Sequence, residues 1–236
     1  MPLLMHDLKW LAALVVTSGC GLISSDVSNF DLTLPDKNFT IDASGWMVDS
    51  AKAAGYLSTN CASAPTVCAS AAMQACTKGC SGMCDTTTHT CDLALDVGLF
   101  QAVDLVKEKP ELQTINDQPV IKVTIDSVTY AVTSNTLNVE TPPMTIYVAP
   151  SSVMDPKDPM AKAIGTIAAV PAMTTTTAPQ AMTYTDSGKA DLINIMSTFK
   201  SPFNIIVGST LTLKSGDPVP TGKLDAVIHV KAHAGI

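Results

Sequence analysis

The sequence predicts a mainly β protein, an antiparallel β-sandwich with one helix in its C-terminal half and a small disulfide-rich helical insertion nearer its N-terminus. Apolar and polar residues alternate along several segments, which is the pattern of a strand with one buried face. Threonine and valine are abundant, and both favour β-strands. Six of the seven cysteines fall between residues 61 and 91, a density typical of a small module held by disulfides.

The start of the chain has the pattern of a secretion signal. An apolar run from Trp10 to Val16 is followed by Thr17, Ser18 and Gly19, and then by Cys20. This segment resembles a bacterial lipoprotein precursor, in which the signal is removed just before a cysteine that then carries the lipid. Plain secretion and a retained membrane anchor are the alternatives, although the apolar run is far shorter than the ~20 residues that a spanning helix needs.

The resemblance and the strand pattern together divide the chain into three parts. Residues 1–19 would be a signal peptide, and residues 20–29 a lipidated tether that begins with the modified Cys20. Residues 30–236 would form the β-sandwich domain, with the cysteine-rich insertion at 58–92. The resemblance implies a protein held in the bacterial cell envelope, at the outer membrane, which contacts the membrane through its N-terminal lipid.

Two short alternating segments open the domain. Apolar residues alternate with polar ones over residues 30–34 and 39–42, which predicts a hairpin or one bent strand with a buried face. Residues 43–60 form a short helical or irregular connection, in which Trp46 and Tyr56 would pack under the cysteine module. A ligand platform at Trp46 is the alternative, but a lone tryptophan beside a disulfide knot usually fills core.

The cysteine module is expected to hold three disulfides among Cys61, Cys68, Cys76, Cys80, Cys84 and Cys91. An alanine-rich run over residues 67–77 predicts a helix that Gly79 ends. On that helix Cys68 and Cys76 would be ~12 Å apart, about twice the reach of a disulfide, so each must pair outside the helix. Cys84 with Cys91, at the ends of a polar loop, is the preferred local pair, although spacing alone does not choose among the pairings.

The alternative use of these cysteines is a metal centre. Cys76, Cys80 and Cys84 follow one another at steps of four residues, with His89 close behind, and could supply thiolates and an imidazole to zinc. Zinc modules more often use C-x-x-C pairs, which this chain lacks, and export favours disulfides. The sequence therefore predicts disulfides, with no metal and no cofactor.

The rest of the chain alternates between strands and turns. Strands are expected over residues 92–105, 120–125, 128–133, 136–139, 144–148, 164–170, 203–213 and 223–232. One helix is expected over residues 187–200, because Leu192, Ile195, Met196 and Phe199 form an apolar stripe at the helical period. The stripe would pack against a sheet.

The charge balance excludes one large class of function. The net charge is −7, and all fourteen basic residues are lysines. Nucleic-acid-binding proteins depend on basic patches and on the bidentate contacts of arginine, so a nucleic-acid role is not expected. The sequence also lacks the usual catalytic-serine, zinc-protease and nucleotide-binding signatures, and no catalytic residue is predicted.

Two residue pairs suggest metal binding at first sight. Asp155 and Asp158, each next to a proline, could form half of a calcium site but are more simply turn residues. His229 and His233 share one face of the last strand at a separation of ~13 Å, too far for one ion to bridge. They are expected to face solvent.

The sequence thus predicts a non-enzymatic exported lipoprotein, a structural or interaction module (adhesion, scaffold or accessory subunit) with a protein partner on the cell envelope. A lipoprotein that binds lipid or another apolar ligand is the alternative, and it would require a cavity within the sheets. An exported hydrolase is the third hypothesis, and it would require convergent carboxylates or a Ser-His pair.

Overall fold

The computed structural model describes residues 30–114, 121–176 and 178–235. In this part of the chain the strands form two antiparallel sheets, which confirms the mainly β class. The signal segment 1–19, Cys20 and the tether 20–29 lie outside the described residues, so the expectations about them stay predictions.

The first sheet has the strand order β1, β11, β5, β8, with β2 as a further partner of β11. Its strands are β1 (Phe30–Asp31), β2 (Lys37–Asp42), β5 (Lys122–Asn135), β8 (Gln180–Ala181) and β11 (Lys223–Gly235). β1 and β2 lie one after the other along the same side of β11, since Phe30 is opposite Ala234 and Lys37 is opposite Ile228. The sequence allowed either a hairpin or one bent strand at the start of the domain, and the structure shows the bent strand.

Strand β5 is longer than the sequence pattern predicts. It runs without interruption from Lys122 to Asn135, where two strands, 120–125 and 128–133, were expected, because register shifts against β11 absorb the break in alternation. Residue 120 lies outside the described residues. The prediction of a strand over residues 136–139 is wrong. This segment instead bonds to the start of β11 and to the loop before it, with Thr136 N donating to Lys223 O and Asn138 N donating to Thr221 O.

The second sheet has the strand order β3, β4, β10, β6, β7, β9. Its strands are β3 (Cys80–Cys84), β4 (Cys91–Val103), β6 (Met144–Pro150), β7 (Lys162–Ile167), β9 (Thr183–Tyr184) and β10 (Phe203–Leu213). β10 pairs with β4 along its whole length, from Phe203 opposite Val103 to Leu213 opposite Leu93. The long central strands expected from alternation are thus present.

The core lies between the two sheets. Phe39, Ile41, Leu224, Ala226 and Ile228 of the first sheet meet Leu99, Met144, Ile167 and Val207 of the second around a gap of only about 20 Å³. A second gap, beside Trp46 and Leu137, measures about 10 Å³. Both gaps are near the volume of a single water, so the apolar faces are closely packed against each other.

Helix α4 (Gly188–Ser197) closes one side of the two sheets. It contacts β5 of the first sheet and β7 of the second, and its Leu192 and Met196 are fully buried. Phe199, just beyond the helix, is buried as well, whereas Ile195 is only partly buried. The predicted apolar stripe is confirmed, although the helix is shorter than residues 187–200.

On the other side, side chains bridge the neighbouring edges of β2 and β4. Lys37 Nζ lies 2.7 Å from Glu108 Oε1 and donates to Ala102 O at 3.4 Å. Trp46 Nε1 donates to Asp96 O at 2.8 Å. The side chains of Lys37 and Trp46 thus bond to two backbone carbonyls of β4 and cover part of its unpaired edge. No strand pairing joins the two sheets in the described residues.

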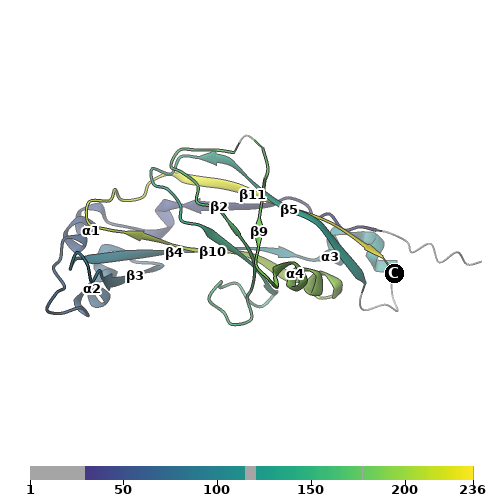
Figure 1. Ribbon diagram of the computed structural model, residues 1–236, viewed down its shortest axis with the longest axis horizontal. Helices are drawn as coiled ribbons and strands as arrows, with labels where there is room; N and C mark the ends of the chain where they lie inside the picture. Colours follow the sequence, from purple (N-terminus) through teal and green to yellow (C-terminus); the bar gives the residue numbers. More distant parts are fainter. Residues whose placement is uncertain (1–29, 115–120, 177, 236) are drawn as a thin grey trace, which may run out of the picture.

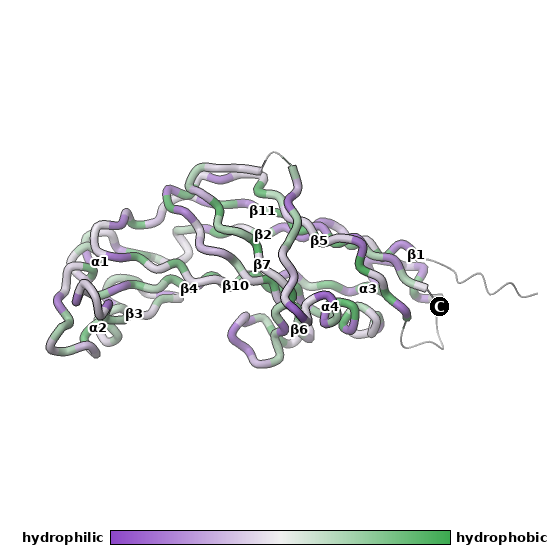
Figure 2. Tube along the Cα trace, viewed as in Figure 1, coloured by the Kyte–Doolittle hydropathy of each residue, from purple (hydrophilic) through white to green (hydrophobic). Residues whose placement is uncertain are grey.

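The remaining helices are α1 (Ser50–Leu57), α2 (Val67–Ala75) and α3 (Leu105–Glu108), with 3₁₀ turns at Ala43–Trp46 and Pro110–Thr114. α3 was not expected; Asp104 Oδ1 accepts a bond from Lys107 N and caps its start. The elements α1, α2 and β3 form one end of an elongated molecule, which we call the cysteine module (Figure 1). The other end holds α3, α4, β1 and the last residues of β11 (Figure 2).

Candidate functional site

Three disulfides hold the cysteine module: Cys61–Cys84, Cys68–Cys91 and Cys76–Cys80. Cys68 and Cys76 do not bond to each other, as predicted from helix geometry. Cys76 is the residue at which α2 ends, with an extended backbone, and it bonds to Cys80 at the start of β3. Of the three bonds, it closes the shortest loop.

The predicted Cys84–Cys91 pair is wrong. These cysteines are direct neighbours across β3 and β4, where cross-strand Cβ atoms are typically ~4.5–5.5 Å apart, longer than the ~3.8 Å of a disulfide. Each bonds instead to the segment that precedes β3, Cys84 to Cys61 and Cys91 to Cys68. The two bonds therefore tie the hairpin to α2 and to the loop before it.

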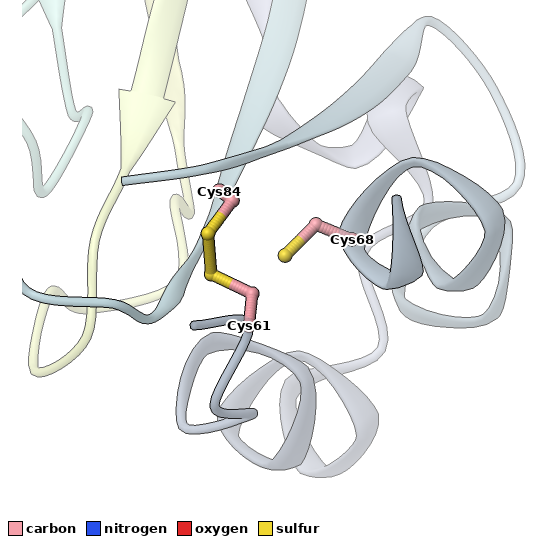
Figure 3. Close-up of side chains that lie close together, drawn as sticks. All are labelled: Cys61, Cys68 and Cys84. Carbon is pink, nitrogen blue, oxygen red and sulfur yellow. A yellow bond between two sulfur atoms is a disulfide. The ribbon is translucent and has the colours of Figure 1, made fainter. Parts of the chain in front are cut away.

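Sulfur atoms from both of these bonds lie close together. The Sγ atoms of Cys61, Cys68 and Cys84 are all within 4.8 Å of one another, and Figure 3 shows Cys68 pointing toward the Cys61–Cys84 bond. Each of the three is in a disulfide, whereas zinc binds the thiolate. The alternative zinc ligands named from the sequence, Cys76, Cys80 and Cys84, are not free thiolates either, because Cys76 and Cys80 are bonded to each other and Cys84 is bonded to Cys61.

Buried polar contacts attach the module to the second sheet. The Tyr56 hydroxyl lies 3.0 Å from Cys68 O and 3.1 Å from Asp92 O, and the two carbonyls share its single hydrogen as acceptors. Burial, with a smaller effect from the Asp92 carboxylate, raises the pKa of Tyr56 to about 12. Trp46 is also buried, so the packing interpretation of these two aromatic residues is confirmed.

Lys214, the residue after β10, pairs with one carboxylate just after β3 and with one in β4. Lys214 Nζ lies 2.9 Å from Asp85 Oδ2 and 3.6 Å from Asp92 Oδ2. The hydrogen bond from Lys214, followed by backbone bonds from Thr87 and Thr88, lowers the pKa of Asp85 to about 2. Asp92 is nearly buried, and its Oδ1 has no partner among the described residues.

An open groove of about 650 Å³ lies on the outer face of the second sheet, beside the cysteine module. Its floor is formed by β4, β10 and β6. Along each of these strands, residues that face outward alternate with residues that face the core. Gly98, Gly208 and Thr145 lie side by side across these strands. Asp96 and Thr210 form the next such row toward the module.

The loop that follows β6, which projects from the sheets in Figure 1, forms one wall of the groove. Pro156 of this loop lies on the two glycines: a Cβ on Gly208 would be 2.5 Å from Pro156 Cβ, and one on Gly98 would be 3.4 Å from Pro156 Cδ. Asn204 Nδ2 donates to Ser151 O and Val153 O and holds the start of the loop. The loop is therefore seated on the sheet.

The groove presents polar groups beside a single aromatic ring. Lys157 Nζ lies 2.6 Å from Asp96 Oδ2, and Thr210 Oγ1 donates to Asp96 Oδ1. Tyr147 and Thr145 also line it, and neither side chain has a hydrogen-bond partner among the described residues. The carboxylate of Asp155, an exposed residue of the groove lining, accepts from Lys157 N and from no other group among the described residues.

The two residue pairs considered for metal binding make ordinary turn and surface contacts. Asp155 and Asp158 each accept a backbone N–H two residues ahead, from Lys157 and Met160, which confirms the turn interpretation. His229 and His233 lie on the outer face of β11, where their Nδ1 atoms contact Asp36 at 2.6 Å and Asp126 at 3.0 Å.

Sequence reasoning missed the groove. Its residues come from three strands and a loop that are far apart in the chain, and only the register of β4 and β10 brings Gly98 and Gly208 together. A glycine near the centre of each of two strand patterns was the available signal, since glycine inside a strand often marks close approach of another segment.

Comparison with protein-family models, with curated proteins and with solved structures found no match to this chain. Within the described residues, none of the helices is both long and apolar enough to cross a membrane.

Proposed function

We propose that the chain is an exported, non-enzymatic lipoprotein of the bacterial cell envelope that acts as an interaction module. A lipid on Cys20 anchors it, at the outer membrane, and a protein partner contacts its cysteine module. We further propose that the two sheets form a sandwich, supported by the closely packed core between them.

The observation that carries this proposal is the placement of the two ends. β1, the first described strand, pairs with the last residues of β11, and Phe30 is opposite Ala234. The cysteine module lies at the far end of the long axis (Figure 1). A tether that leads from Cys20 to Phe30 therefore places the module away from the membrane.

The cysteine module has features suited to a partner surface. From Asn60 to Cys84 its only charged side chain is Lys78. Met73 on α2 and Met83 on β3 are 57% and 54% exposed, and methionine adapts its shape to a partner. Disulfides and buried contacts keep the backbone beneath these side chains ordered, which lowers the entropy cost of binding.

The apolar-ligand alternative gains no support from the core. A drug-sized or lipid ligand needs a pocket of ~300 Å³ or more. The gaps that lie between the two sheets measure about 10 and 20 Å³.

The proposal is tested in cells that express the full chain, with a photo-crosslinking residue at Met73 or, as the matched control, at exposed Lys231 on β11. We expect Met73, and not Lys231, to crosslink to an envelope protein, and Cys20→Ser to release the chain from the membrane. Equal or absent crosslinking at both positions would refute the partner surface. Membrane retention of Cys20→Ser would refute the anchor, and turnover of an ester, peptide or glycoside substrate would refute the non-enzymatic assignment.

A further inference from the structure

We propose that the groove on the outer face of the second sheet is a binding site for a neutral saccharide. The inference goes beyond the interaction module, and it depends on neither the lipid anchor nor the protein partner. The groove volume of about 650 Å³ is within the ~300–1,000 Å³ range of ligand sites. It is sufficient for a short segment of a glycan chain.

The charges around the groove disfavour an anionic ligand. Asp96 and Asp155 line it, and Lys157 is the only cationic residue among its lining residues. That lysine is already paired with Asp96 at 2.6 Å. A phosphate or a sulfated chain would meet one uncompensated carboxylate and no free cation, in a protein whose net charge is −7.

The floor of the groove also disfavours a peptide that binds by adding a strand. β10 and β6, which form most of the floor, are interior strands with neighbours on both sides. Their backbone groups are engaged in the sheet, so an extended peptide would find no free edge there. The groove also lacks arginine and has Tyr147 as its only aromatic residue, a poor set for a peptide hot spot.

The groups that do line the groove match the chemistry of a sugar ring. A pyranose offers hydroxyls that donate and accept hydrogen bonds, and a face of C–H groups that packs on an aromatic ring. Tyr147 supplies the ring, and Thr145 supplies a hydroxyl with no partner among the described residues. The exposed Asp155 carboxylate accepts a single backbone bond and retains acceptor capacity for sugar hydroxyls.

The floor of the groove limits where a sugar ring can lie. Gly98 and Gly208 have no side chains, and Pro156 rests on both of them. The ion pair between Lys157 and Asp96 closes the end toward β4. The ring would therefore lie beside Pro156, against Tyr147 and Thr145 of β6.

The test uses the full-length protein on an array of neutral oligosaccharides, anionic oligosaccharides and peptides, followed by calorimetric titration with the best neutral tetrasaccharide. We expect selective binding of neutral chains. Tyr147→Ala should weaken the affinity at least ~10-fold through loss of stacking, and Thr145→Val ~2- to 10-fold through loss of one hydrogen bond. Thr212→Val, on the same outer face of β10 but outside the groove, is the matched control and should bind like the original chain.

Three results would overturn the inference: no binding of any neutral oligosaccharide, preferred binding of anionic chains or peptides, or equal affinity of Thr145→Val and Thr212→Val. Because Tyr147 also packs against the seated loop, thermal unfolding of each variant is measured. Thr145→Val nearly preserves shape, so it decides the outcome if Tyr147→Ala unfolds. A chain that crosslinks through Met73 but binds no saccharide would leave the proposed module standing without this site.

Discussion

Gly208 lies directly beneath Pro156, in a position where an added Cβ would come within 2.5 Å of the proline Cβ. The loop after β6 can therefore rest on the sheet only while residue 208 has no side chain. On the adjacent strand, the Cβ of a residue at 98 would lie 3.4 Å from Pro156, an ordinary contact distance.

We therefore expect Gly208→Ala to be destabilising and Gly98→Ala to be tolerated. Overpacking typically costs about 1–3 kcal/mol, and Gly208→Ala should lose this much free energy of unfolding in urea. Gly98→Ala should stay within about 0.5 kcal/mol of the original chain. Equal losses in the two variants would show that Pro156 does not rest on Gly208.

The disulfides are expected to differ in their contribution to stability. Cys68–Cys91 spans 23 residues and Cys76–Cys80 spans 4. In the chain-entropy model, removing the first pair with alanines should cost about 3 kcal/mol and removing the second about 2 kcal/mol. Urea unfolding of the two double variants measures the difference.

Peptide mapping without reduction should recover Cys61 linked to Cys84, and a Cys84–Cys91 peptide would contradict the structure.

Lys214 should stabilise the contact between the cysteine module and β10. Lys214→Met leaves the nearly buried Asp92 without its cation, so we expect a lower urea midpoint of unfolding at pH 7. Lys231→Met is the control, because Lys231 is exposed on β11. Similar unfolding midpoints for the two variants would mean that solvent already screens the Lys214 ion pairs.

The contact between Lys214 and Asp85 predicts that the stability of the fold decreases in acid. The hydrogen bond from Lys214, followed by the backbone bonds from Thr87 and Thr88, lowers the pKa of Asp85 from 3.8 to about 2. This carboxylate therefore stabilises the fold above pH ~4 and loses that contribution as the pH falls toward 2. In Lys214→Met the pKa of Asp85 should return toward its ordinary value. Melting temperatures measured from pH 5 to pH 2 should therefore fall less steeply in Lys214→Met than in the original chain.

The raised pKa of Tyr56 predicts that the stability of the fold also decreases at high pH. The pKa of Tyr56 is raised from 10.0 to about 12, so its neutral form stabilises the fold below pH ~10 and the contribution is lost as the pH rises through 12. Tyr56→Phe removes the bonds to Cys68 O and Asp92 O and should cost about 1–2 kcal/mol at pH 7. Its stability should then fall less between pH 10 and 12, as followed by circular dichroism.

Local patterns in the sequence carry most of the strand and helix assignments, because alternation and helical period depend on neighbours along the chain. The strand from Phe203 to Leu213 and the buried stripe of α4 are examples. The pairing of Cys84 with Cys61 was not accessible in this way, because it depends on how the segment before β3 folds back over the hairpin. The groove depends on register between distant strands, which alternation does not specify.

The long strands β4, β10, β5 and β11 run along the long axis of the molecule, between the cysteine module and the end that holds β1 (Figure 1). Hydrogen bonds between antiparallel strands are perpendicular to the strand direction. A mechanical pull between the two ends would therefore load these ladders in shear, so that many bonds must break together. Strands in this orientation resist a pull along the long axis more strongly than a pull across it.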